Sequence, residues 1–320
     1  MSSLSLQAAG AAREAIDTHV PRLVAENFAS KLFDQDPALW GSAAQEEAAI
    51  RLGWTDAVRV SRPLVPEIEQ LRHDFAREGV TRFVLAGMGG SSLAPEVITR
   101  SAGVDLFVLD STDPEMVTKA LEDLEHTALV VSSKSGSTVE TDSARRVFVN
   151  AFERAGIDAP SRVVVVTDPG SPMDSASREA GYRKVFTADP NVGGRFSALT
   201  AFGLVPSGLA GVDVAALLDD AEEATEMLRE DDKNNIGLQL GAALGGTSPL
   251  RDKIVLVNQG APFVGFADWA EQLIAESTGK SGTGVLPVVV NDAAPEVTSG
   301  APDILVVSLV DDEAVTEEQG

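Results

Sequence analysis

Residues 82–93 read RFVLAGMGGSSL, a short apolar run that passes directly into glycines and serines. Similar apolar runs recur along the middle of the chain, separated by segments long enough for a helix. The predicted strands are Arg82–Ala86, Leu106–Leu109, Ala128–Val131 and Arg162–Thr167. Continuously apolar strands of this kind are typical of a parallel sheet that helices cover on both faces. The sequence therefore predicts an α/β fold of doubly wound parallel sheets in three layers.

Three of these strands end in loop-forming stretches, at residues 87–90, 132–137 and 167–171. In open α/β sheets, ligands bind at the carboxyl ends of the strands. We therefore expect a binding site to be built from these loops.

A second alternation of strands and helices follows residue 230. Its predicted elements are Ile236–Ala243, Lys253–Asn258, Ala267–Ser277, Val285–Val290 and Ile304–Leu309. Residues 6–78 instead have the apolar spacing of helices. We expect a helical amino-terminal segment (1–78), a first α/β domain (79–230) and a second α/β domain (231–320). Only a polar stretch follows the last predicted strand, so the second domain is expected to be truncated.

Composition limits the classes of function. The 25 basic and 49 acidic residues give a formal net charge of −24, which opposes binding to nucleic acid or to an anionic membrane surface. The chain has no cysteine, which excludes disulfides, thiolate catalysis and cysteine zinc sites. Its first 20 residues lack the basic segment followed by an apolar run that is typical of a signal peptide, and the sequence has no apolar run of about 18 residues. We expect a soluble, cytoplasmic protein.

The first loop, Gly87–Leu93, reads GMGGSSL and precedes a predicted helix. It does not meet the dinucleotide fingerprint G-x-G-x-x-G, because Ser92 stands where the third glycine is required. A nicotinamide cofactor is therefore disfavoured. Two interpretations stay open: a glycine turn needed only for packing, or a turn whose amides and Ser91 touch a ligand.

The second loop, Ser132–Thr141, reads SSKSGSTVET and is the stronger signal. Six of its ten residues are Ser or Thr, so hydroxyls and backbone amides can donate several hydrogen bonds to a phosphate. The Walker spacing G-x-x-x-x-G-K-[ST] is absent. The alternative is a polar turn that caps a helix, with Glu140 in the first helical turn.

The third loop, Asn191–Ser197, reads NVGGRFS. Gly193 and Gly194 allow the backbone to bend and to place Arg195 over a ligand, where its guanidinium can hold an oxyanion. A surface arginine beside a flexible turn is the alternative interpretation.

A carboxylate and an amide lie near the end of the helix predicted over Ala267–Ser277. Gln272 and Glu276 are four residues apart and therefore share one helical face, which can point into a cleft. A surface charge is the alternative interpretation of Glu276. No spacing of His, Asp and Glu in the sequence predicts a metal site.

These motifs together resemble the phosphoglucose isomerase (glucose-6-phosphate isomerase) family, which has the sugar isomerase (SIS) fold. The matching stretches are GMGGSSL, SSKSGSTVET, NVGGRFS and QLIAESTGK, the last at Gln272–Lys280. The resemblance is specific because four motifs occur in the family's order within residues 81–280.

The resemblance implies a glycolytic and gluconeogenic enzyme that interconverts glucose 6-phosphate and fructose 6-phosphate through a cis-enediol(ate), with no metal or organic cofactor. It assigns Glu276 as the base that moves a proton between C2 and C1, and Arg195 as the cation that stabilises the enediolate. The positions that correspond to the phosphate loop are Ser133, Lys134, Ser135 and Thr138. Those that correspond to sugar contacts are Gly90, Ser91, Gly194 and Gln272. A homodimer is also implied.

The chain departs from the family at several positions. Ala94 replaces a usual glycine. The family uses a histidine downstream of the glutamate motif and a lysine near its carboxyl end, but here no histidine follows His126 and no lysine follows Lys280. We therefore expect an amino-terminal portion of a longer isomerase. The alternatives are a catalytically incomplete fragment, a non-catalytic SIS-type sugar-phosphate-binding protein, and a non-hexose ketol isomerase.

Overall fold

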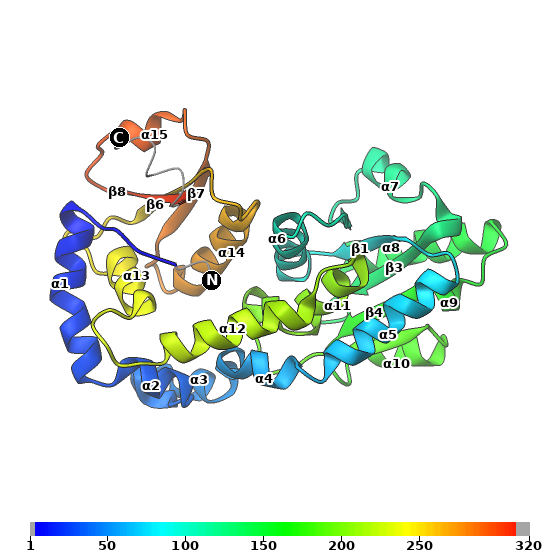
Figure 1. The fold of residues 1–320 in the computed structure, drawn as a ribbon, viewed down its shortest axis with the longest axis horizontal. Coiled ribbons are helices and arrows are strands. Elements are labelled where there is room, and N and C mark those ends of the chain that lie inside the picture. Colours follow the sequence, from blue (N-terminus) through cyan, green and yellow to red (C-terminus); the bar gives the residue numbers. More distant parts are fainter. Residues whose placement is uncertain (1–3, 312–320) are drawn as a thin grey trace. The chain divides into compact units, whose positions relative to one another are not determined.

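The structure, a computed structural model, describes residues 4–311. The chain forms two compact units (Figure 1). The continuous unit comprises residues 56–220, and the discontinuous unit joins residues up to 55 to those from 221 onward. The boundary at residues 220 and 221 falls inside helix α12 (Val214–Leu228).

The continuous unit is built on a five-stranded sheet in the order β2-β1-β3-β4-β5, with every pair parallel. The strands are β1 (Arg82–Gly87), β2 (Phe107–Leu109), β3 (Thr127–Ser132), β4 (Val163–Thr167) and β5 (Lys184–Thr187). The four strands predicted in this region are confirmed within a residue or two at each end. The fifth, β5, was not predicted, because it is a four-residue edge strand in which only Phe186 is buried.

Helices cover both faces of this sheet, which gives three layers. One face packs against α8 (Val139–Arg154), α7 (Pro114–Ala120), α9 (Ala159–Arg162) and α10 (Pro172–Glu179). The other packs against α11 (Ala201–Ala210), which lies beside α5 (Leu64–Arg77) and α6 (Leu93–Ser101) (Figure 1). Because helices cover both faces, β3 and β4 are buried along their whole length, as their continuous apolar sequence predicts.

The face toward α8 has a core of aromatic and branched side chains. Phe148 and Phe152 of α8 are fully buried, with ring centroids 5.9 Å apart, and they pack against Val84, Leu129 and Val165 of the sheet. Their spacing of four residues places both rings on one helical face.

The discontinuous unit has a parallel sheet in the order β7-β6-β8. Its strands are β6 (Lys253–Gln259), β7 (Leu286–Val290) and β8 (Ile304–Val310). Ile254 and Leu256 of β6 pack against α14 (Phe266–Thr278). The other helices are α1 (Gly10–Ala25), α2 (Phe28–Phe33), α3 (Gln45–Arg51), α13 (Ile236–Gly245) and α15 (Pro295–Thr298). α1 packs along α13 in a second apolar cluster (Figure 1).

The predicted fold class is confirmed: the chain is a parallel α/β protein with two sheets and a helical amino-terminal region. Residues 4–55 of the predicted segment 1–78 belong to the discontinuous unit, and residues 56–78 belong to the continuous one. The domain boundaries at residues 78 and 230 stay a prediction. Residues 1–3 and 312–320, which fall in the first and last predicted segments, lie outside the described residues.

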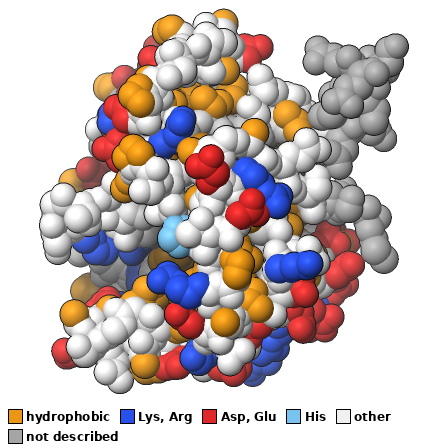
Figure 2. All heavy atoms as spheres, turned by 90° about the vertical axis from the view of Figure 1, so that its left-hand side faces the viewer, with side chains coloured by type: hydrophobic (Ala, Val, Ile, Leu, Met, Phe, Trp, Pro, Cys, Tyr) orange, Lys and Arg blue, Asp and Glu red, His pale blue; other side chains and the backbone are white. Residues whose placement is uncertain are grey.

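Charged side chains are visible on the face of the molecule that Figure 2 displays. Figure 2 shows acidic and basic side chains interspersed with apolar ones on the face that it displays. Within residues 4–311, no helix combines the length and the apolar character needed to cross a membrane.

The core beneath α8 generates a stability prediction. We expect Phe148→Ala to lower the free energy of unfolding by about 3–5 kcal/mol, because it deletes a fully buried ring and leaves a cavity. The adjacent Val147→Ala is the control, since Val147 is 39% exposed and should cost far less. Urea unfolding followed by circular dichroism measures both. Equal losses for the two variants would show that Phe148 is not a core residue.

Candidate active site

Two short turns meet at the carboxyl edge of the continuous unit's sheet. The turn η3 (Gly89–Ser91) follows β1, and the turn η5 (Gly194–Leu199) follows β5. The buried Ser197 hydroxyl donates to the carbonyl of Gly194 at 2.6 Å and approaches that of Gly90 at 3.4 Å. A Cβ on Gly90 would lie 2.2 Å from the Gly194 carbonyl oxygen, so only glycine permits this approach.

This contact brings together four of the residues predicted for the site. Gly90 and Ser91 lie in η3 and are buried, whereas Gly194 and Arg195 lie in η5 and are half-buried. The guanidinium carbon of Arg195 lies 5.0 Å from the ring centroid of Phe196, a cation–π geometry.

The serine-rich loop between β3 and α8 is held by its own hydroxyls. The buried Ser133 Oγ accepts from the Gly136 amide at 3.1 Å and lies 3.2 Å from Thr138 Oγ1. Ser135 Oγ accepts from the Ser137 amide at 3.2 Å. Thr138 occupies the N-cap position of α8, but its side chain makes no capping bond. The loop therefore orders hydroxyls and amides at the start of a 16-residue helix, where an anion is favoured.

Gly136 makes the bend of this loop possible. Its φ of +68° lies in the left-handed region, and a Cβ there would lie 2.9 Å from both the amide nitrogen and the Cβ of Met173 in α10. A side chain at this position is therefore excluded twice, by backbone conformation and by space.

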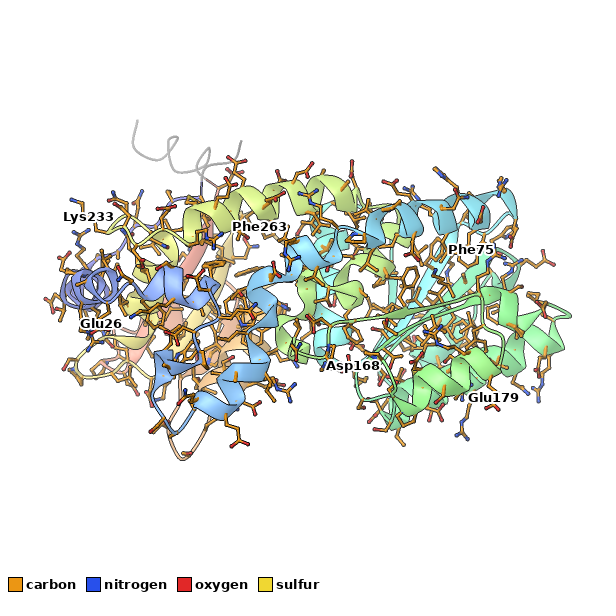
Figure 3. All side chains as sticks on the ribbon, turned by 90° about the horizontal axis from the view of Figure 1, so that it is seen from below. Glu26, Phe75, Asp168, Glu179, Lys233 and Phe263 are labelled. Carbon is orange, nitrogen blue, oxygen red and sulfur yellow. The ribbon has the colours of Figure 1, made fainter. Side chains whose placement is uncertain are left out.

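Lys134 is directed toward the neighbouring loops. Its Nζ lies 2.6 Å from Oδ2 of Asp168, in the loop that follows β4, and 3.5 Å from the carbonyl oxygen of Pro190. Asp168, labelled in Figure 3, was not among the predicted residues. The available signal was its place directly after a buried strand, in a loop that was predicted to lie at the binding edge.

Gln272 and Glu276 lie on α14 of the discontinuous unit. Gln272 Nε2 donates to Glu276 Oε1 at 3.0 Å, which confirms that the two side chains share one face. Glu276 is exposed and Gln272 is half-buried. The end of the helix is fixed by Thr278, whose Oγ1 accepts from the Val285 amide at 3.0 Å.

The predicted residues thus fall into two groups. The serine loop and the turns η3 and η5 belong to the continuous unit, and Gln272 and Glu276 belong to the discontinuous unit. A single site formed from both groups stays a prediction. Among the described residues, no group of three or more His, Asp and Glu side chains is arranged to hold a metal ion.

A pocket of about 270 Å³ lies behind the serine loop, between α8 and α10. Gly136 and Ser137 of the loop form part of its wall, together with the polar cluster of Asp142, Arg145 and Tyr182. Arg145 donates to Asp142 at 2.6 Å and to the Tyr182 hydroxyl at 2.7 Å. The exposed Arg146 also donates to Asp142, at 2.7 Å. This cluster fixes the first turns of α8 beneath the loop.

Comparison with known proteins places the chain in a family. The family model described as phosphoglucose isomerase matches residues 71–245. The chain belongs to the phosphoglucose isomerase family. The match contains the serine loop and both turns but ends before Gln272 and Glu276, whose proposed roles therefore rest on the QLIAESTGK motif.

A curated relative carries the name of this family, and two solved structures share the fold. Glucose-6-phosphate isomerase of Gloeothece citriformis (strain PCC 7424) is 34% identical over 213 residues, 62% of this chain and 40% of that protein. A hypothetical protein of Thermus thermophilus has a TM-score of 0.76 at 28% identity, over 96% of this chain and 77% of that one. A glucose-6-phosphate isomerase from Chlamydia trachomatis has a TM-score of 0.65 at 23% identity, over 77% and 54%. The chain spans less than half the length of the Gloeothece relative.

The contact between the two turns gives a prediction for the glycines. We expect Gly90→Ala to lower the free energy of unfolding by about 2–3 kcal/mol, because the added methyl would collide with the backbone of Gly194. Gly194→Ala is the matched control, since a Cβ there meets nothing within 4 Å. Thermal unfolding of the two variants checks this. If both variants unfold at the same temperature as the parent protein, the contact between Gly90 and Gly194 is refuted.

The cluster on α8 gives a prediction for pH. Burial acts to raise the pKa of Asp142, but the hydrogen bonds and charges of Arg145 and Arg146 outweigh it, so this pKa lies below its ordinary value. A carboxyl with a lowered folded pKa adds stability that is fully present above its unfolded pKa of about 3.9 and is lost as the pH falls through the folded value. Asp142→Asn should therefore lower the free energy of unfolding by about 1–2 kcal/mol at pH 7.

The difference in unfolding free energy between Asp142→Asn and the parent protein should become smaller as the pH falls below about 4, because the Asp142 carboxylate of the parent protein is then protonated and loses its charge. Urea unfolding across a pH series measures it. Glu153→Gln, at an exposed position near the other end of α8, is the control and should change little at any pH. A pH-independent cost at Asp142 would mean that packing, and not charge, explains the loss.

Proposed function

We propose that this chain carries the chemistry of an aldose–ketose isomerase that interconverts glucose 6-phosphate and fructose 6-phosphate. The observation that carries the proposal is the meeting of η3 and η5 beside the serine loop, within the segment that matches the family model. The Gloeothece relative is named a glucose-6-phosphate isomerase, which supports the same substrate.

The serine loop is the proposed phosphate site. A phosphate dianion at the start of α8 would accept hydrogen bonds from loop amides and from the hydroxyls of Ser135 and Thr138, and the helix dipole favours a negative charge there. The proposed sugar contacts are Gly90, Ser91, Gly194 and Gln272.

Proton transfer is assigned to Glu276. It would take the proton from C2 of open-chain glucose 6-phosphate while O1 gains a proton, which gives the cis-enediol(ate). O2 would then lose a proton and C1 would gain one, which gives fructose 6-phosphate. Arg195 would stabilise the negative charge that develops on the enediolate oxygen. The hydrogen bond from Gln272 orients the carboxylate. A cytoplasmic location, expected from the composition, and a homodimer, implied by the family resemblance, belong to the same proposal.

A second candidate is a protein that binds hexose phosphate without turning it over. It is favoured by one observation: the family match contains the proposed phosphate loop but ends at residue 245, before the proposed base. Binding would then need only the loops of the continuous unit.

An assay of Glu276→Gln separates the two functions. Fructose 6-phosphate is supplied, and the glucose 6-phosphate formed is measured through glucose-6-phosphate dehydrogenase. We expect kcat of the variant to fall by about 10²–10⁴-fold, because an amide cannot accept the C2 proton. Glu271→Gln, at an exposed position on the same helix, is the control and should retain the parent rate. Binding of fructose 6-phosphate without turnover by the parent chain would favour the second candidate.

A further inference from the structure

The ion pair between Lys134 and Asp168 lies among loops that leave three neighbouring strands. The ion pair with Lys134 links the serine loop after β3 to the loop after β4. The same ammonium approaches the carbonyl of Pro190, in the segment after β5 that leads into η5. One charged group therefore touches every loop between the proposed phosphate site and Arg195.

The ion pair is partly withdrawn from solvent. The side chains of Lys134 and Asp168 are 26% and 19% exposed. The second carboxylate oxygen of Asp168, Oδ1, is buried and has no hydrogen-bond donor within the described part of the chain. A partly buried carboxylate depends on its cation, so each side chain holds the other in place.

The bases of these loops are tied together independently of the ion pair. Thr167 Oγ1 donates to the carbonyl of Ser133 at 2.7 Å and lies 2.8 Å from the hydroxyl of Ser171. The Ser133 amide donates to the carbonyl of Val166 at 3.0 Å. Removing Asp168 should therefore free the tips of the loops while their bases stay paired.

We propose that Asp168 is a positioning residue for the isomerase site. By fixing the ammonium of Lys134, it holds the phosphate loop at a set distance from the turn that carries Arg195. The phosphate and the enediolate lie at opposite ends of one substrate, so this distance decides whether both ends are held at once. The inference rests on the proposed function, but Asp168 itself touches no reacting atom.

The competing interpretation is that Lys134 binds the phosphate directly through its charge. Asp168 would then compete for the ammonium, and removing it would leave binding unchanged or make it tighter. Removing Lys134 would weaken binding in either case. The two interpretations therefore predict opposite effects for the aspartate variant, and this difference is what the experiment measures.

The test uses the full chain and a set of matched variants: Asp168→Asn, Lys134→Met, the double variant, and the control Asp158→Asn. Asp158 is exposed and precedes β4, at the opposite end of that strand from Asp168. The probe is glucitol 6-phosphate, a linear hexitol phosphate that cannot isomerise, and calorimetry gives its Kd. The coupled assay gives kcat and KM for fructose 6-phosphate.

We expect Kd to rise about tenfold in Asp168→Asn and in Lys134→Met, because the loop donors lose their fixed orientation. The double variant should match the single variants, since both remove the same ion pair. kcat/KM should fall further than binding does, because the Arg195 turn is displaced as well. Lys134→Arg, which preserves the pair, should restore binding, and Asp158→Asn should match the parent.

Other outcomes overturn the inference. These are parent-like or tighter binding by Asp168→Asn, or a loss in the double variant equal to the product of the two single losses. If Asp168→Asn fails to fold, Asp168→Ser, which also removes the carboxylate, carries the test, and parent-like or tighter binding by that variant would refute the inference. A parent chain that binds the probe without turnover contradicts the proposed function and leaves the binding comparison intact. A parent chain that does not bind the probe contradicts both.

Discussion

The register of the five-stranded sheet is the constraint on which the candidate site depends. Gly87 at the end of β1 pairs with Ser132 at the end of β3, and Ser132 pairs with Val166, one residue before β4 ends. Thr167 and Thr187 pair at the ends of β4 and β5. Because these strands are parallel and end at one level, their loops leave the sheet as neighbours. A shift of two residues in one pair would remove a loop from the group without exposing the core.

The close approach of the η3 and η5 backbones brings together two of the loops that the strand register places at the same edge of the sheet. Gly90 and Gly194 are more than a hundred residues apart in the sequence, yet their turns touch without an intervening side chain. The buried hydroxyl of Ser197 donates to the carbonyl of Gly194 and also lies near that of Gly90. The backbone of Arg195 is thereby held beside η3 by main-chain packing. Since main-chain packing costs little side-chain entropy, it suits a site that must be formed before its ligand arrives.

Local patterns predicted the parts of the structure that local forces decide. The buried strands β3 and β4 are visible in the sequence as apolar runs, and the pairing of Gln272 with Glu276 follows from their spacing of four residues. The edge strand β5 was not predicted, because one buried phenylalanine is too weak a signal of a strand. The ion pair between Lys134 and Asp168 was not predicted from the sequence for a different reason. Its members are 34 residues apart, and only the sheet order makes them neighbours.

The charges around the serine loop indicate how a protein of net charge −24 would bind a phosphate. The charge of Lys134 is balanced by Asp168, and that of Asp142 is shared between two arginines on α8. Glu140, in the first turn of that helix, opposes an anion. Little net positive charge is left at the loop, so affinity would come from oriented amides and hydroxyls at the helix start. Oriented donors select a tetrahedral oxyanion by geometry, and they lose that ability when the loop moves. This gives the ion pair between Lys134 and Asp168 a function other than attraction: it keeps the loop still.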